Sequence, residues 1–250
     1  LREKGLSAAA KKADRVAAEG VVYAVADAAK KVGAIIEVNS ETDFVAKNAD
    51  FNAFVAQCAQ IIMEQNPADV DALLACKTEN GMTVEELLRE KILVIGENLK
   101  IRRFVREEGT LATYIHAGGK IGVMVKFDVS DGIADKAEFV ECGHDVAMQI
   151  AAITPGYLKR EEVPAAVVEE EKKILEAQIQ NDEKLKNKPA QVIEKMVTGR
   201  IGKFYENNCL LQQAFVKNGD LSVEQYIAEE AKKAGGTMKV TDFVRFEKGE

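Results

Sequence analysis

The residue types best suited to a specific contact lie in one polar stretch, where an acid, Asp43, directly precedes an aromatic residue, Phe44. A carboxylate beside an exposed ring is typical of a contact on a partner protein. In the structural alternative, Asp43 caps a helical turn and Phe44 packs as a hydrophobic staple. Glu41 and Asp43 could also form a pair for general acid–base catalysis, although two acids at this spacing are common by chance.

No other catalytic motif accompanies this stretch. The sequence contains no G-x-S-x-G, no P-loop and no G-x-G-x-x-G, so we expect neither enzyme activity nor a cofactor. His116 and His144 do not belong to a set of ligands at metal-site spacing, so we expect no bound metal. His144 falls in a predicted helix, where a structural role is usual. His116 falls at the tip of a predicted hairpin, where its side chain could contact a partner.

Composition excludes several classes of protein. The chain has 250 residues and a net charge of −7, which argues against a surface that mainly binds DNA or RNA. No apolar run reaches the roughly 20 residues that a membrane span needs, and no signal peptide is evident. Because the first residue is Leu, we expect a fragment or a processed chain. The cysteines are far apart and predict reduced, packed thiols in a cytoplasmic protein: Cys58, Cys76, Cys142 and Cys209.

The elements that position the corner begin with a helix and a hairpin. Residues 2–19 are rich in Ala and Lys and predict a helix that ends at Gly20. From Gly20 to Asn39 apolar residues alternate with small or polar ones around a polar turn, which predicts a β-hairpin. After the corner, apolar residues at helical spacing predict a helix capped by Asn48 or Asp50.

Two shorter helices and a strand follow. Residues 70–74 predict a short helix that stops at Gly81. Thr83 and Glu86 form a capping-box pattern at the start of the next helix, which residues 96–98 break. Residues 99–107 are expected to be extended.

The pattern then starts again at Gly109, and the offset of 89 residues from Gly20 predicts a duplicated unit. Each unit would contain a hairpin, a helix and a late third strand, about the smallest such unit that is stable. The third strands share the letters Phe-Val-Arg at 104–106 and 243–245. The matched pairs in the hairpins are Gly20 and Gly109, Ala28 and Ala117, Lys31 and Lys120, and Gly33 and Gly122.

An insertion interrupts the second unit. Residues 163–186 and 192–204 carry narrow apolar stripes and predict an antiparallel coiled-coil hairpin. The predicted fold class is α+β, with two duplicated subdomains, each a small three-stranded antiparallel sheet with helices, plus this hairpin. The expected boundaries are a linker helix at 1–19, a first core subdomain at 20–108, a second at 109–162 with 208–250, and the hairpin at 163–207.

The two units differ at the corner. Where the first has Ser40-Glu41-Thr42-Asp43-Phe44, the second has Val129-Ser130-Asp131-Gly132-Ile133. The frame matches but the letters do not. A specific function is therefore expected at the first corner.

Several stretches together resemble the elongation factor Ts family. The clearest is Glu37 to Lys47, and others are Ile95 to Arg103, Tyr114 to His116 with Lys120 to Val123, and Lys195 to Arg200. The resemblance covers essentially the whole chain. It implies two related α+β subdomains with a coiled-coil hairpin in the second. The family usually adds a small helical domain before the Ala-Lys helix and a short extension after Glu250.

The resemblance also implies a function, which is guanine nucleotide exchange on the translational GTPase elongation factor Tu in its GDP form. Asp43 and Phe44, with Thr42 and Val45, would enter the GTPase beside its magnesium site. Secondary contacts would come from Ile95, Gly96, His116 and Lys11. The resemblance implies no cofactor and leaves both a monomer and a homodimer open.

Two alternatives remain at this stage. The chain could be an interaction scaffold that binds a partner through the predicted helical hairpin. It could also be an enzyme that uses Glu41 and Asp43.

Overall fold

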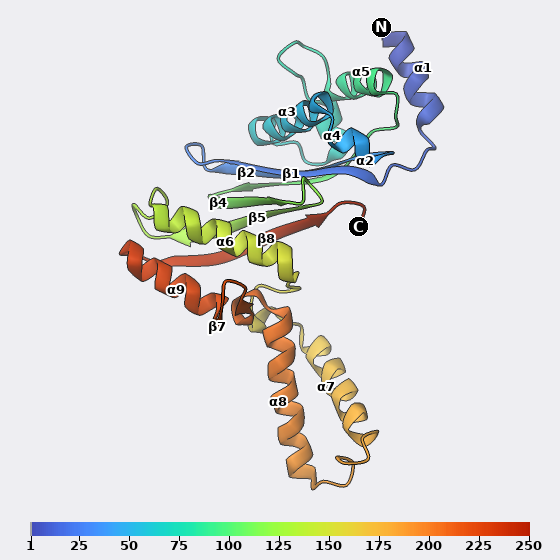
Figure 1. Cartoon of the computed structure of the whole chain (residues 1–250). Helices are drawn as coiled ribbons and strands as arrows, with labels where there is room; N and C mark the ends of the chain where they lie inside the picture. Colours follow the sequence, from blue (N-terminus) through green and yellow to red (C-terminus); the bar gives the residue numbers. More distant parts are fainter. Residues whose placement is uncertain (1) are drawn as a thin grey trace.

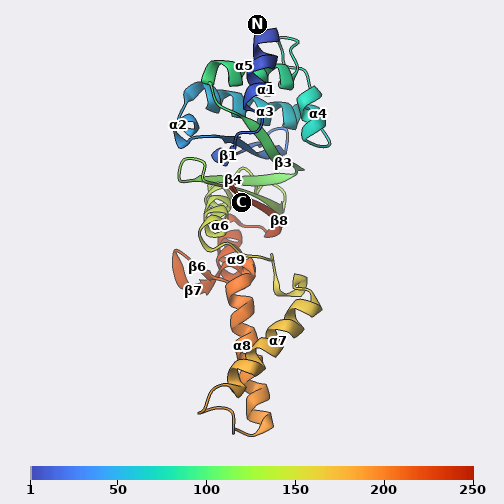
Figure 2. The same cartoon turned by 90° about the vertical axis from the view of Figure 1, so that its right-hand side faces the viewer.

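The computed structural model describes residues 2–250, which form stacked layers of helices and sheets (Figures 1 and 2). Helices cover the outer face of one three-stranded sheet, a second three-stranded sheet packs against its inner face, and further helices cover that second sheet. A pair of helices projects from this body (Figure 1). The mixed α+β class is thus confirmed.

The first sheet has the order β1-β2-β3 and is antiparallel throughout. All nine residues of the central strand β2 are buried, because helices cover one of its faces and the second sheet covers the other. The elements of this part are α1 (Arg2–Lys12), β1 (Glu19–Asp27), β2 (Val32–Ser40), α2 (Asp43–Ala46), α3 (Ala49–Gln65), α4 (Val70–Ala75), α5 (Val84–Ile95) and β3 (Lys100–Glu108).

The second sheet has the order β4-β5-β8 and is also antiparallel. Its outer face packs on α6 and α9, and a small β6-β7 hairpin lies beside them. The elements are β4 (Thr110–His116), β5 (Ile121–Val129), α6 (Ala137–Ile153), η1 (Arg160–Glu162), α7 (Ala165–Gln180), α8 (Ala190–Asn208), η2 (Leu210–Gln212), β6 (Ala214–Phe215), β7 (Asn218–Ser222), α9 (Val223–Ala234) and β8 (Met238–Glu247).

The two parts share local features at matching positions. Each central strand has a register shift, at Glu37/Val38 in β2 and at Lys126/Phe127 in β5. The helices α5 and α9 each have 12 residues, begin with a capping box and end at a left-handed glycine. Capping satisfies backbone groups that a helix end leaves unpaired. Whether the parts arose by duplication, and where their boundaries lie, stay predictions.

Two glycines allow the sheets to approach each other closely. A Cβ atom on Gly33 would lie 2.7 Å from the Leu111 side chain, and one on Gly122 would lie 2.5 Å from the Val22 side chain. The space is instead filled by a small apolar cluster between the sheets. These matched glycines therefore serve sheet-on-sheet packing.

The projecting helices α7 and α8 have a core of their own. It consists of Leu175 and Ile179 from α7 with Val197 and Ile201 from α8. The coiled-coil character of this pair stays a prediction.

Three local expectations differ from the structure. The first helix ends at Lys12 rather than at Gly20, because the next residues form a turn and an irregular segment. That segment is bonded to the first sheet's corner through Arg15, whose carbonyl accepts a hydrogen bond from the Asn98 side chain. The β6-β7 hairpin was not predicted, and a helical turn at the place of α2 was expected only in the structural alternative. Within residues 2–250, no helix is both long and apolar enough to cross a membrane.

Candidate functional site

The corner after β2 carries its acid and its aromatic ring on the outside. Thr42 is the N-cap residue of α2, and its side chain makes no capping bond. Asp43 is exposed and Phe44 is 80% exposed, whereas Val45 is buried in the core under the first sheet's helices. The structural alternative is therefore wrong, since Asp43 is not the cap residue and Phe44 does not pack inward. A large ring turned to water is typical of a partner contact.

Two glutamates join this corner to the segment after α5, and we call Glu41 and Glu97 the carboxylate clamp. Glu97 accepts hydrogen bonds from the backbone N–H groups of Glu41 and Thr42, both at 3.0 Å, and from the Thr42 hydroxyl at 2.6 Å. In return, Glu41 accepts a bond from the N–H of Asn98 at 2.7 Å and lies 3.6 Å from the Arg15 guanidinium. Such charge-assisted bonds are short and strong. Glu41 is thus engaged in structural bonds, which speaks against a proton-transfer role.

The clamp brings the end of α5 beside the corner. Ile95 is half-buried, and Gly96 follows it, exposed, with a φ of 83° that favours glycine. Val94, immediately before them, is 69% exposed. Sequence reasoning missed Val94. Its position could have identified it, because an apolar residue outside the apolar spacing of the buried face of α5 must point toward solvent.

The turn between β4 and β5 lies at the same end of the molecule. The carbonyl of Gly119 in this turn accepts a hydrogen bond from the N–H of Val22 at 2.7 Å. Val22 stands near the start of β1, and the first residue of β1, Glu19, pairs with Ser40 at the corner. His116 begins the turn and is exposed, with its Nδ1 atom 3.0 Å from the hydroxyl of Tyr114.

Lys11 is exposed in the last turn of α1. The chain from there to β1 passes Arg15, which contacts both Glu41 and Asn98. The structure thus connects α1 to the corner through the backbone and Arg15, and it leaves the Lys11 side chain in solvent.

A buried carboxylate, which sequence reasoning also missed, fastens the end of the chain to the first sheet. Glu37 is fully buried in β2, where it accepts bonds from the Arg103 guanidinium at 2.7 Å and the Asn39 amide at 2.9 Å. It also accepts a bond from the N–H of Gly249 at 2.8 Å. Arg103 in turn stacks over the ring of Phe246 at 4.2 Å. We call this group the C-terminal clasp; it ties β8 of the second sheet to β2 of the first.

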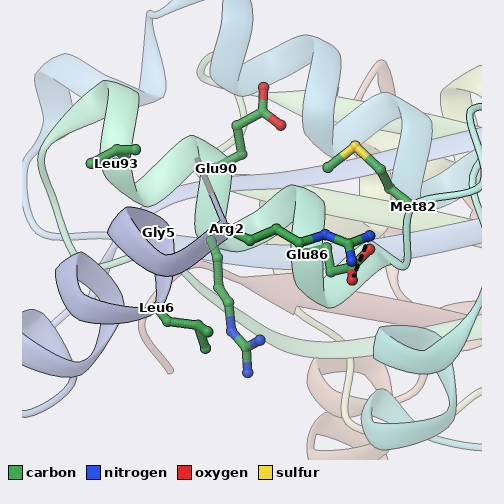
Figure 3. A pocket seen from close by; sticks show the side chains of 8 residues that line it. Arg2, Gly5, Leu6, Met82, Glu86, Glu90 and Leu93 are labelled. Carbon is green, nitrogen blue, oxygen red and sulfur yellow. Dashed lines mark ion pairs between the residues drawn. The ribbon is translucent and has the colours of Figure 1, made fainter.

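A groove between α1 and α5 is the hollow drawn in Figure 3. Its volume is about 290 Å³, and Leu6, Met82 and Leu93 supply apolar lining. Arg2 pairs with Glu86 across it at 3.2 Å. Arg2 and Glu86 thus neutralise each other, and Arg89 and Glu90 also line the groove.

The thiols are not suited to nucleophilic chemistry. Burial raises the pKa of Cys58 and of Cys142 from 9.0 to about 12. The nucleophile is the thiolate, so these groups are unreactive at neutral pH. In the part of the chain that the structure describes, no three His, Cys, Asp or Glu side chains are grouped so that they could hold a metal.

Taken together, these bonds bring several of the predicted site residues to one end of the molecule. Thr42–Val45 and Ile95–Gly96 are brought together by the clamp, and His116 lies at the same end of the sheets. The chemistry this arrangement supports is insertion of a ring and a carboxylate into another molecule.

Comparison with known proteins places the chain in one group. A sequence model described as elongation factor Ts matches residues 41–250. A protein named elongation factor Ts from Clostridioides difficile (strain 630) is 46% identical over 252 residues, which cover 100% of this chain and 81% of that protein. Proteins of the same name from Clostridium perfringens (strain SM101 / Type A) and Trichlorobacter lovleyi are each 45% identical, with the same coverage.

Proposed function

The chain belongs to the elongation factor Ts family, and we propose that it is a guanine nucleotide exchange factor for the GTPase elongation factor Tu. It would bind the GDP form of that GTPase and speed the release of GDP. The observation that carries this proposal is the 80% exposure of Phe44 beside the exposed Asp43. The ring of Phe44 faces solvent and does not belong to the hydrophobic core.

The proposed mechanism acts on the metal that holds the nucleotide. Magnesium requires near-ideal octahedral geometry and usually bridges phosphates to a few protein ligands. A ring and a carboxylate pushed in beside that site would displace its protein ligands. Each tenfold loss of affinity for GDP corresponds to about 1.4 kcal/mol. Because magnesium requires strict geometry, a displacement of its protein ligands by about an ångström would weaken GDP binding enough to release it. No covalent bond is made or broken, and the factor needs no cofactor of its own.

Binding linkage then explains how the factor leaves. If the factor weakens GDP binding by some ratio, GDP must weaken factor binding by the same ratio. A nucleotide that rebinds with magnesium therefore expels the factor. The clamp supports this role because a wedge can transmit force only if its base is fixed.

The secondary contacts are assigned by position. Ile95 and Gly96 lie beside the corner, and His116 lies at the same end, so all three could meet one face of the GTPase. Val94 adds an exposed apolar side chain to this surface. Lys11, at the end of α1, would contact the partner only at the margin.

The test is stopped-flow release of a fluorescent GDP from elongation factor Tu. We expect the wild-type chain to accelerate release at substoichiometric concentration, and we expect Phe44→Ala to reduce the second-order rate constant about 10–100-fold. Val140→Ala is the matched control, since Val140 is also a well-exposed apolar residue but lies on α6. Equal rates for all three proteins would rule out the wedge.

The same proteins distinguish the scaffold alternative, which depends on α7 and α8. If that helical pair supplied the binding energy, replacing it by a short linker would abolish capture of the GTPase, whereas Phe44→Ala would leave both capture and GDP release unchanged. We expect Phe44→Ala to change GDP release.

A further inference from the structure

We propose that Glu97 is a positioning residue for Phe44. Together with Glu41 it fixes the corner and the end of α5 as one preassembled contact surface. This assignment rests on the proposed function. It adds a residue that touches no reacting group and acts only through the backbone of the corner.

The first support is the direction of the bonds in the clamp. Both oxygens of Glu97 are used on the corner, one by two backbone N–H groups and the other by the hydroxyl of Thr42. Glu41 returns a bond to the backbone of Asn98 at 2.7 Å. Each carboxylate thus holds the segment that carries the other, and the bonded atoms are 55 to 57 residues apart in the chain. The two segments cannot move separately without breaking several charge-assisted bonds.

The second support comes from the matching corner of the other sheet. After the left-handed cap of α9, Gly235, the position equivalent to Glu97 is Gly236. A Cβ atom at Gly236 would lie 2.6 Å from the side chain of Ile133. Ile133 accepts a bond from the N–H of the N-cap residue Lys136, as Val45 does from the N-cap residue Asn48, so it corresponds to the buried Val45. Ile133 is 2% exposed. Where the cap is followed by glycine, the side chain of Ile133 occupies the space beside it.

The remaining bonds at that corner also differ. The N–H of Ser130 donates a hydrogen bond to the carbonyl of Thr237 at 3.1 Å. The N–H of Thr237 donates one to the hydroxyl of Ser130 at 2.8 Å. A serine hydroxyl therefore serves there in place of the two carboxylates. At the first corner the side chain of Glu97 stands at the position that glycine occupies here, and its carboxylate makes the bonds. The residue after the cap thus decides how the two segments are joined, by carboxylates at the first corner and by direct packing with a serine at the second.

The physical benefit of this arrangement is preorganisation. A contact segment that is already ordered loses less conformational entropy on binding than a mobile one. Without the Glu97 carboxylate, the N–H groups of Glu41 and Thr42 would turn to water and the corner would sample other positions. The ring of Phe44 would still be present but would reach the partner in the right position less often.

The experiment is a double-mutant cycle on the rate constant for GDP release at limiting factor concentration. The proteins are the wild type, Glu97→Ala, Phe44→Ala and the double variant. We expect Glu97→Ala alone to be slower by about tenfold, and the double variant to match Phe44→Ala within about twofold, because Glu97 acts through Phe44. Multiplied effects of the two substitutions would show a general structural role and overturn the assignment.

Two further variants and one further readout sharpen the cycle. Glu97→Gln keeps the chain length and one acceptor oxygen and should restore part of the rate, whereas Glu90→Ala, an exposed acid on α5, should behave as wild type. Hydrogen exchange should become faster at the amides of Glu41 and Thr42 in Glu97→Ala and stay unchanged in the body of β2. Unchanged protection of those two amides would also overturn the assignment.

The outcomes separate the two proposals. If Phe44→Ala slows release and Glu97→Ala does not, only the role of Glu97 is lost. If Phe44→Ala has no effect, the proposed wedge is lost, and the positioning role with it.

Discussion

The corners that follow β2 and β5 occupy similar places in the fold but are held by different bonds. Each follows the central strand of a three-stranded sheet and lies beside the segment after a capped 12-residue helix. In the first, Phe44 is exposed beside a carboxylate clamp, and in the second, Ile133 is buried over a glycine. The comparison teaches that both corners bury one apolar residue, Val45 and Ile133, while only the first also carries an exposed ring. The first corner is also the one that is held by carboxylates.

The comparison also separates stability from function. Residues that hold a unit together recur in both parts, as the capping boxes and sheet-facing glycines do. Residues that would act on a partner occur in one part only. If the proposed function is right, the residues that act on the partner are separate from those that stabilise the fold.

The largest difference in the free energy of unfolding is expected between substitutions at the register-shift positions of the two central strands, Glu37 in β2 and Lys126 in β5. Glu37 is a buried charge that holds the C-terminal clasp, and Glu37→Ala would remove the carboxylate that Arg103, Asn39 and Gly249 share. Breaking a buried ion pair costs about 3–5 kcal/mol, and we expect the lower end of this range because the Arg103 side chain is 32% exposed. Lys126 is 37% exposed and lies 3.6 Å from Glu107, so Lys126→Ala should cost no more than about 1 kcal/mol. Urea unfolding of both variants measures the difference, and equal losses would contradict the clasp.

The corner residues themselves should show the next largest difference. Ile133→Ala removes buried apolar volume and should lower the free energy of unfolding by about 2–5 kcal/mol. Phe44→Ala removes an exposed ring and should change it by no more than about 0.5 kcal/mol. Thermal unfolding followed by circular dichroism would show this as a large and a negligible shift in Tm. A comparable loss for Phe44→Ala would mean that the ring packs on its own subunit.

The glycine opposite Ile133 offers a smaller effect. Gly236→Ala would place a Cβ atom 2.6 Å from Ile133 and also against the hydroxyl of Ser130. Such overpacking costs about 1–3 kcal/mol. Gly219→Ala is the control, because a Cβ atom there meets open space. We expect denaturant midpoints to fall for the first variant only, and an unchanged midpoint for Gly236→Ala would remove the steric explanation of the inward corner.

The helical cores should behave alike in the two parts, and this is the smallest expected difference. Cys58 in α3 and Cys142 in α6 both have a pKa raised to about 12 by burial. The native protein binds these protons more tightly than the unfolded chain. Both contributions to stability are therefore complete below about pH 9 and decline as the pH rises toward 12.

At pH 8, labelling of native protein with a thiol reagent should accordingly be slow at both cysteines, with site-resolved rates read by mass spectrometry. Fast labelling of one of them alone would show that its helix opens independently of the other.

Much of this architecture is predictable from local signals. Alternating apolar residues indicate the strands, and the Thr83–Glu86 capping box marks the start of α5 where the structure has it. Asn48 caps α3 as one of the two predicted candidates. These features depend on residues a few positions apart, which a sequence displays directly.

The features that escape prediction depend on distant pairs. The partners of Glu97 lie 55 and 56 residues away, and Glu37 bonds to a backbone group 212 residues further along the chain. Nothing in the spacing of these residues marks them as bonded. The irregular segment after α1 is likewise held by distant contacts, those of Arg15 with Glu41 and Asn98.

The central claim is that Phe44 acts outside its own fold. The most direct test is the rate of fluorescent GDP release from elongation factor Tu, measured well below the unfolding temperature with Phe44→Ala and Ile133→Ala in parallel. We expect Phe44→Ala to lose at least about tenfold in rate while Ile133→Ala, still folded, stays close to wild type. Full activity of Phe44→Ala, or an equal loss in both variants, would contradict the account.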